Sequence, residues 1–91
     1  MAEESRLQRK IVIDLEKQGW DVTKIMLCNK PGSPDLECKK EIRQIFYMEV
    51  KAKGKKATPL QLYRHEILRK MGFPVFVVDS WDKYLALKQR L

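Results

Sequence analysis

One run of residues limits the folds open to this chain more than any other feature. Residues 45–52 read IFYMEVKA and are rich in aromatic and branched side chains, which predicts a β-strand. Successive side chains of a strand point to opposite faces, so Glu49 and Lys51 share one face and apolar side chains fill the other. A charged group in the middle of a core strand costs free energy unless another group pairs with it. The strand therefore predicts either an ion pair or a chemical site on one face.

The other expected elements follow in an order typical of an α/β fold. They are a helix over 3–18, strands over 22–28, 35–39 and 43–52, a helix over 59–71, a strand over 74–78 and a helix over 81–90. A capping box fixes the start of the second helix, with Thr58 as N-cap, Pro59 at the first position and Gln61 at the third. A crossover through that helix should be right-handed and join parallel strands. We therefore expect an α-β-β-β-α-β-α order and a mixed sheet flanked by helices.

Apolar side chains predict how these elements pack. The second helix carries a stripe that we expect to face the core, formed by Leu60, Tyr63, Ile67, Leu68 and Met71. Four other large groups either cap the ends of the sheet or remain available for a second subunit, namely Trp20, Trp81, Tyr84 and Leu91. Cys28 and Cys38 lack the spacing of a zinc or redox pair, so we expect two reduced, buried thiols in strands.

The chain is small and strongly basic. It has 91 residues, enough for a single domain over 1–91, and a formal net charge of +7. The positive charge favours a polyanion such as nucleic acid as partner, although a soluble basic surface would have the same composition. No apolar run approaches the ~20 residues of a membrane span, and residues 1–10 lack the apolar segment of a signal peptide. We therefore expect no membrane association and a cytosolic or nuclear location.

Asp35 is a second charged residue within the predicted sheet, directly after Gly-Ser-Pro. Opposed residues of an antiparallel hairpin share a face. Asp35 therefore shares the face of Glu49 if it lies opposite an odd-numbered residue such as Tyr47, which a loop with an odd number of residues, for example 40–42, would allow. A slip of one residue would mix polar and apolar side chains on both faces. We therefore expect Asp35 and Glu49 together on a mostly polar face.

Glu4 offers a third acid from the first helix. At about 100° per residue it falls on the apolar stripe of that helix, where it either joins Asp35 and Glu49 or simply benefits from the helix dipole. Clustered carboxylates repel one another unless a cation joins them, and such oxygen ligands suit Mg²⁺ or Mn²⁺. An ion there could activate water beside a phosphate, with Lys51 close by. Surface ion pairs would explain the same residues without any chemistry.

Three motifs occur in a fixed order along the chain, namely Gly32-Ser33-Pro34-Asp35, Glu49-Val50-Lys51 and Gln61. This set resembles the PD-(D/E)xK nuclease superfamily, and within it the virus-type replication-repair branch, VRR-NUC, whose pattern is G-x-P-D, E-x-K and a downstream glutamine. The N-terminal ESRLQ is similar to the first motif of that family. The resemblance spans nearly the whole chain and implies a restriction-endonuclease-like core.

The resemblance implies a metal-dependent endonuclease that hydrolyses phosphodiester bonds of DNA. It implies a site for Mg²⁺ or Mn²⁺ formed by Asp35, Glu49, the Val50 carbonyl and Glu4. Lys51 would lie by the attacking water. Gln61 would steady the site, although the capping box explains this residue without any function.

Lysines next to this site are expected to contact DNA phosphates. They are Lys53, Lys55 and Lys56, and none of them is placed for base readout. One acid cluster makes one cut per visit, whereas a four-way (Holliday) junction needs two paired cuts and is nearly two-fold symmetric. Stand-alone VRR-NUC domains are known as dimeric junction-cutting nucleases and are typical of phage. The resemblance therefore implies a homodimer acting on branched DNA in the cytoplasm of a bacterial host.

Two other functions stay open on the sequence alone. A double-stranded-RNA-binding module shares the α-β-β-β-α order and needs lysines without acids, so binding of a divalent metal would distinguish the two. A flap-cutting or nicking nuclease would share every motif above. His65, the only histidine, lies in the middle of a helix. It is expected to be a surface or packing residue, because one histidine cannot build a histidine-metal cluster.

Overall fold

The computed structural model describes residues 2–41 and 44–91. Its elements are α1 Ala2–Lys17, β1 Asp21–Lys24, β2 Leu36–Lys39, β3 Ile45–Val50, α2 Pro59–Lys70, β4 Val75–Val78 and α3 Trp81–Lys88. The strands form a four-stranded sheet in the order β1-β2-β3-β4, in which β3 is antiparallel to β2 and parallel to β4. The predicted order of elements and the mixed sheet are confirmed.

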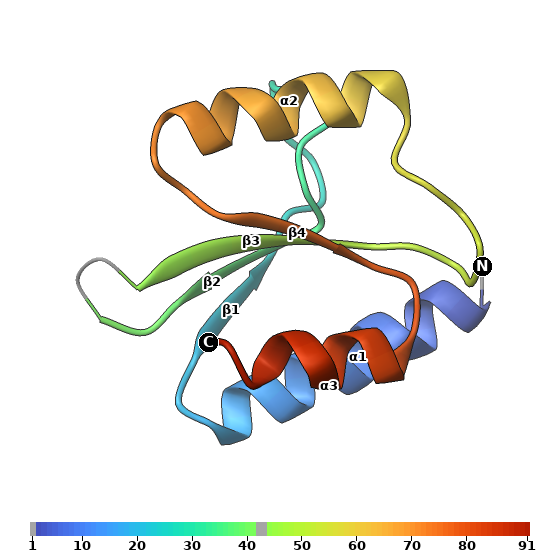
Figure 1. Ribbon diagram of the computed structural model, residues 1–91, viewed down its shortest axis with the longest axis vertical. Helices are drawn as coiled ribbons and strands as arrows, with labels where there is room; N and C mark the ends of the chain where they lie inside the picture. The colour runs from blue at the N-terminus through green and yellow to red at the C-terminus, as the bar shows by residue number, and fades with distance from the viewer. Residues whose placement is uncertain (1, 42–43) are drawn as a thin grey trace.

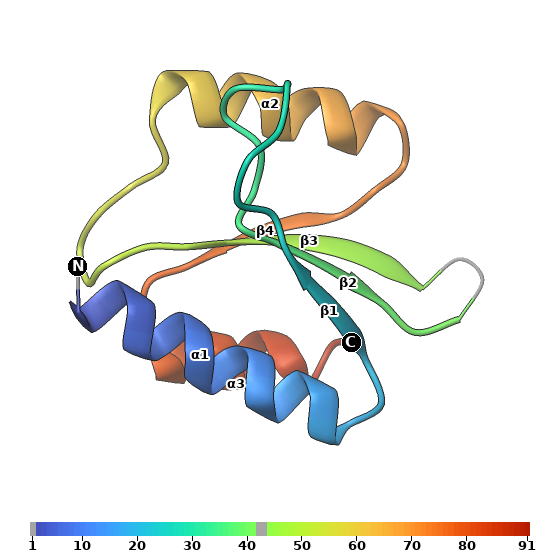
Figure 2. The ribbon, with the colours of Figure 1, turned by 180° about the vertical axis from the view of Figure 1, so that it is seen from behind.

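The elements are arranged in three layers. α2 covers one face of the sheet, and α1 and α3 cover the other (Figure 1). The view from behind shows the same arrangement, with the chain between β3 and α2 passing close to the start of α1 (Figure 2). Within residues 2–41 and 44–91, no helix is long and apolar enough to cross a membrane.

The pairing of β2 with β3 decides which side chains share a face. Glu37 lies opposite Tyr47. Two residues further along the same pairing, Asp35, the residue before β2, lies opposite Glu49. The expected pairing had Asp35 opposite Tyr47, and the observed register is displaced from it by two residues. Every side chain keeps its predicted face because the side-chain period of a strand is two. The loop expected over 40–42 includes a residue that lies outside the described part of the chain.

The apolar face of the sheet forms the hydrophobic core with α1 and α3. Alternate residues of β2 and β3 are buried there, namely Leu36, Cys38, Phe46, Met48 and Val50. α1 contributes Ile11 and Leu15 to the same cluster. Burying each of these large side chains stabilises the fold by about 1.5–3 kcal/mol. The predicted burial of Cys38 is confirmed.

Aromatic side chains close the ends of this core rather than forming a free surface. Trp20 and Tyr84 are buried, and the Tyr84 hydroxyl donates a hydrogen bond to Asp14 of α1 at 2.6 Å. Trp81 packs against the core, with Lys10 Nζ 4.2 Å from the centre of its ring. Trp20 and Tyr84 are therefore not available to a second subunit, and the alternative that they cap the sheet is the observed one. Trp81 is half-buried and Leu91 is 40% exposed, so an interface at these two residues stays a prediction.

α2 begins at the predicted capping box but does not pack as predicted. Three members of the expected core stripe face solvent, since Leu60, Tyr63 and Met71 are 53%, 66% and 57% exposed. Leu68 of the stripe is buried as predicted, Ile67 is half-buried, and His65 is buried beside them against the sheet. The sheet face beneath α2 is the polar one, so polar side chains of the helix find partners there, and Leu60, Tyr63 and Met71 of the stripe turn outward.

β1 is shorter than the predicted strand over 22–28. Its last contact with the neighbouring strand is the hydrogen bond that the Ile25 N–H donates to the Asp35 carbonyl at 2.7 Å. The ladder cannot continue because the next residue across, Pro34, has no N–H. Cys28 therefore lies exposed in a loop and not buried in a strand, which corrects the sequence prediction.

Gly32 holds this loop against the start of α2. Its φ is +81°, a conformation that favours glycine, and a Cβ at this position would lie 2.7 Å from the carbonyl oxygen of Leu60. The loop that leads to Asp35 is thereby packed against the helical turn that carries Gln61.

Candidate active site

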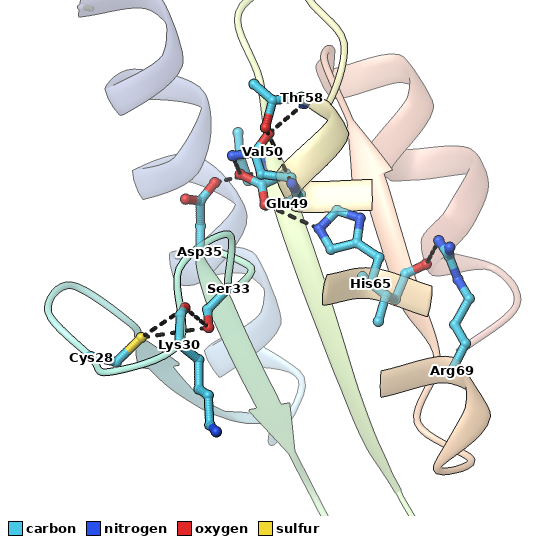
Figure 3. Close-up of polar contacts among 11 residues, drawn as sticks. Cys28, Lys30, Ser33, Asp35, Glu49, Val50, Thr58, His65 and Arg69 are labelled. Carbon is cyan, nitrogen blue, oxygen red and sulfur yellow. Dashed lines mark hydrogen bonds and ion pairs between the residues drawn. The ribbon is translucent and has the colours of Figure 1, made fainter. Parts of the chain in front are cut away.

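Asp35 and Glu49 come together at the start of β2 and the end of β3, beneath α2 (Figure 3). Asp35 Oδ2 accepts a hydrogen bond from the backbone N–H of Val50 at 2.8 Å. This bond links the side chain of Asp35 to the backbone of the residue that follows Glu49. The two acids that the sequence predicts on one face are therefore neighbours in the structure.

Glu49 is almost completely buried, with 2% of the residue exposed. Two side chains one turn apart on α2 contact its carboxylate. Gln61 Nε2 donates to Oε2 at 3.3 Å, and His65 Nε2 lies 3.3 Å from Oε1. The other end of the Gln61 side chain accepts the Thr58 N–H at 2.9 Å. The same glutamine thus completes the predicted capping box and contacts the buried acid.

Burial and neighbouring charge make the Glu49 carboxyl difficult to ionise. Desolvation is the largest cause, followed by the charge of Asp35 and the hydrogen bond with it, and Glu4 adds a smaller effect in the same direction. Lys51 opposes them because a positive charge favours the carboxylate. Together they raise the pKa of Glu49 to about 8. A carboxyl with such a pKa beside a second carboxyl is typical of functional sites.

The Asp35–Glu49 pair fits a hard divalent cation. A cation between the two carboxylates would offset the repulsion that now raises the pKa of Glu49. Carboxylate oxygens are the ligands that Mg²⁺ and Mn²⁺ prefer. Among the residues that the structure describes, no group of three His, Cys, Asp or Glu side chains is placed to hold a metal. Such an ion would therefore take its other ligands from backbone carbonyls, water or substrate, as Mg²⁺ commonly does.

The first turn of α1 approaches the site without joining the acid pair. The charge of Glu4 reaches Glu49, but its side chain does not complete a group of three ligands in the described part of the chain. The neighbouring Glu3 accepts a hydrogen bond from the backbone N–H of Lys53 at 2.8 Å. The start of α1 is thereby tied to the loop that follows β3.

The loop between β3 and α2 carries the three lysines predicted to contact DNA. Lys53, Lys55 and Lys56 are all exposed. The loop backbone is held from both sides, by the bond from Lys53 to Glu3 and by the bond from the Gly54 N–H to Asp79 Oδ2 at 3.0 Å. This anchoring leaves the ammonium groups free in solvent, two to five residues beyond Lys51.

His65 is the site residue that the sequence interpretation missed. We expected an ordinary surface or packing residue, whereas the side chain is completely buried and contacts Glu49. Burial, followed by the positive charges of Arg69 and Lys51, lowers its pKa, so the ring is neutral. One signal could have indicated this role: His65 lies four residues after Gln61, so both point from the same side of a helix.

The comparisons with known proteins agree with the fold and with the motifs. No protein-family model matches the chain. The protein "Putative nuclease p44" of Acyrthosiphon pisum secondary endosymbiont phage 1 is 33% identical over 79 residues, which cover 87% of this chain and 85% of that protein.

Two solved structures have the same architecture. One, described as a VRR_NUC domain, is 34% identical with a TM-score of 0.87, and the match covers 96% of this chain and 95% of that one. The other, a VRR_NUC domain protein, is 21% identical with a TM-score of 0.78 over 97% and 86% of the two chains, and bears on the fold alone. With its motifs, its acid pair and these relatives, the chain belongs to the VRR-NUC family of nucleases.

Proposed function

We propose that this nuclease is an endonuclease that requires Mg²⁺ or Mn²⁺ and acts as a homodimer on branched DNA, above all on four-way junctions. The observation that carries the proposal is the contact between Asp35 and the buried carboxyl of Glu49, which leaves two acids without a compensating charge between them. The family membership supports phosphodiester hydrolysis as the reaction.

The proposed metal site consists of Asp35, Glu49 and the Val50 carbonyl, with Glu4 binding a water molecule of the ion. When bound, the cation supplies activation of water and neutralisation of charge on the phosphate. Lys51 shares the strand face of Glu49 and would orient the attacking water. Gln61 steadies the Glu49 carboxylate through its 3.3 Å hydrogen bond.

Substrate binding would depend on shape and charge rather than on base sequence. Lys53, Lys55 and Lys56 lie beside the acid pair in an anchored loop, where their side chains can reach phosphates. The alternative of a non-catalytic RNA-binding module loses its basis, because the chain belongs to a nuclease family.

The homodimer follows from the number of acid pairs. One pair per chain makes one cut, whereas a four-way junction is resolved by two cuts related by a two-fold axis, which a two-fold dimer matches. The outward stripe of α2 offers apolar surface for such a contact, since Leu60, Tyr63 and Met71 are more than half exposed.

Cleavage assays with matched variants test the metal chemistry. Asp35→Asn and Glu49→Gln keep the shape of each side chain and remove its charge. Each should abolish Mg²⁺-dependent cutting of DNA while the circular dichroism spectrum stays unchanged. Glu37→Gln, which alters an acid bonded to Tyr47 on the same face, should still cut. Full activity in EDTA or in either of the first two variants would refute the proposal.

A panel of DNA substrates tests the preference for junctions. Linear duplex, flapped duplex and a four-way junction of equal length are incubated with Mg²⁺, and we expect paired, symmetric cuts in the junction. Cutting of flaps or linear duplex with an uncut junction would refute the junction preference and favour the flap-cutting alternative.

A further inference from the structure

His65 is a completely buried polar side chain that the proposed chemistry does not use. It lies on α2, is 0% exposed, and its Nε2 is 3.3 Å from Glu49 Oε1. Its other nitrogen, Nδ1, is buried and has no hydrogen-bond partner among the described residues. A buried polar group costs free energy unless it is paired, so a half-paired imidazole in this position needs an explanation.

The contact dictates where the single ring proton lies. In the metal-binding state, in which the Glu49 carboxyl is ionised, it has no hydrogen to donate, so a hydrogen bond between Nε2 and Oε1 requires the proton on Nε2. The bare Nδ1 then keeps only an unpaired lone pair. A second proton on Nδ1 would add an orphaned N–H and a charge to a site already close to Arg69 and Lys51, which burial disfavours.

Gln61 and His65 act on Glu49 from the same side. Gln61 Nε2 donates to one carboxylate oxygen, and the His65 ring lies against the other. Both residues come from α2, one turn apart, so one helix contacts both carboxylate oxygens. Figure 3 shows the His65 ring against Glu49. An ionised carboxylate has about four lone-pair sites, so each oxygen keeps one that these two contacts do not use.

We propose that His65 is a positioning residue, which fixes the orientation of the Glu49 carboxylate toward Asp35 by donating a hydrogen bond from Nε2. This inference rests on the proposed metal-dependent function and adds a residue to it. Hydrogen-bond partners of metal-binding carboxylates typically contribute 10- to 100-fold to metal affinity or activity, without touching the metal themselves. His65 has the burial and the contact that such a role requires.

Three substitutions separate positioning from packing. His65→Gln keeps an N–H donor at the place of Nε2, His65→Asn moves the donor to the place of Nδ1, and His65→Leu removes it while keeping the volume. Mn²⁺ binding is measured by calorimetry on the DNA-free protein, and stability by urea unfolding of the metal-free protein. Leu68→Val, a buried change one turn further along α2, serves as the control for loosened packing.

We expect His65→Leu and His65→Asn to weaken Mn²⁺ binding by about 10- to 100-fold, and His65→Gln to bind close to the wild-type value. Leu68→Val should lower the urea midpoint and leave Mn²⁺ affinity unchanged. Wild-type Mn²⁺ affinity in folded His65→Leu, or an affinity loss that follows the urea midpoint across all four variants, would overturn the inference.

An NMR measurement tests the hydrogen bond between His65 and Glu49 independently of metal binding and of DNA cleavage. Well above pH 8, where the Glu49 carboxyl is ionised, two-bond ¹⁵N–¹H correlations of the single histidine should show a neutral ring protonated on Nε2, with a changed Nε2 signal in Glu49→Gln. A ring protonated on Nδ1 would overturn the proposed contact. Wild-type protein that shows the Nε2–H ring but binds no Mn²⁺ would refute the proposed metal chemistry and the positioning role with it, while leaving the His65–Glu49 bond in place.

Discussion

Glu49 is the residue whose protonation the fold controls most strongly. An exposed glutamate has a pKa of 4.5, whereas the pKa of Glu49 is about 8 in the folded protein. Between these values the folded state binds a proton that the unfolded chain has released, so the free energy of unfolding falls as pH rises. The loss is at most about 1.4 kcal/mol for each pH unit and ends once the folded carboxyl is ionised.

We therefore expect the metal-free protein to become less stable from about pH 5 to pH 8, within the window set by the two pKa values. Glu49→Gln cannot ionise, so its stability should lack this decline and exceed that of the wild type at pH 8. Urea unfolding at a series of pH values measures both. Glu37→Gln should retain the wild-type decline, and a flat wild-type profile would contradict the raised pKa.

The acid pair could be predicted from the sequence, but the contacts around it could not. Asp35 and Glu49 share a face in any register shifted by an even number of residues, so the prediction survived a two-residue displacement. The contact of His65 with Glu49 depends on how α2 is rotated over the sheet. The helical period shows which residues share a face of a helix, but it does not show which face will pack against the sheet.

α2 shows how the partner of an element decides which of its faces is buried. Its apolar stripe is the stronger pattern in the sequence, yet the polar sheet face binds the side of the helix that carries Gln61 and His65. The stripe formed by Leu60, Tyr63 and Met71 is left outside. Exposed apolar surface of this kind is typical of an interaction site.

Replacing this stripe tests whether α2 forms the subunit contact. The triple variant Leu60→Gln, Tyr63→Gln and Met71→Gln should give a monomer near 10.8 kDa in light scattering, where the wild type gives twice that mass. Because the three side chains are exposed, the free energy of unfolding should change by no more than about 0.5 kcal/mol for each substitution.

The monomeric variant should still bind Mn²⁺ but lose paired cutting of four-way junctions. Ile13→Gln, an exposed apolar residue on α1, is the matched control and should remain dimeric. A triple variant that stays dimeric would move the interface elsewhere, and a monomeric wild type at micromolar concentration would refute the dimer itself.

The whole molecule carries a net charge of +7, and its distribution decides how DNA is held. Replacing Lys53, Lys55 and Lys56 with glutamine should weaken DNA binding and reduce the slope of log K against log salt by up to about 2.7, since each phosphate contact contributes about 0.9. Binding is measured by fluorescence anisotropy over a salt series. Every lysine variant also carries Glu49→Gln, which should prevent cleavage of the DNA during the measurement.

A second triple variant controls for net charge alone. Lys17, Lys70 and Arg90 are exposed and lie outside the loop that follows β3, and their replacement by glutamine removes the same charge. This control should lower affinity slightly and change the slope less than the loop variant. Equal slopes in the two variants would mean that the loop has no special place in the DNA interface.

At the scale of the whole chain, the sequence predicted the order of elements and the mixed sheet, because glycines, prolines and caps mark the ends of local segments. It overestimated β1, since the strand depends on a partner that Pro34 interrupts. Trp20 and Tyr84 were open to two interpretations because residue volume alone does not say whether a small core can enclose an aromatic ring.

Gly32 has a consequence for how such a chain can change over evolutionary time. A side chain at this position would collide with the Leu60 carbonyl at 2.7 Å and push away the helical turn that holds Gln61 against Glu49. The conformations of the loop before β2 and of the first turn of α2 therefore cannot change independently of each other. We expect homologues with a larger residue at position 32 to carry a compensating shift at the start of α2, so that the two segments are inherited as one unit although Pro59 lies 27 positions after Gly32.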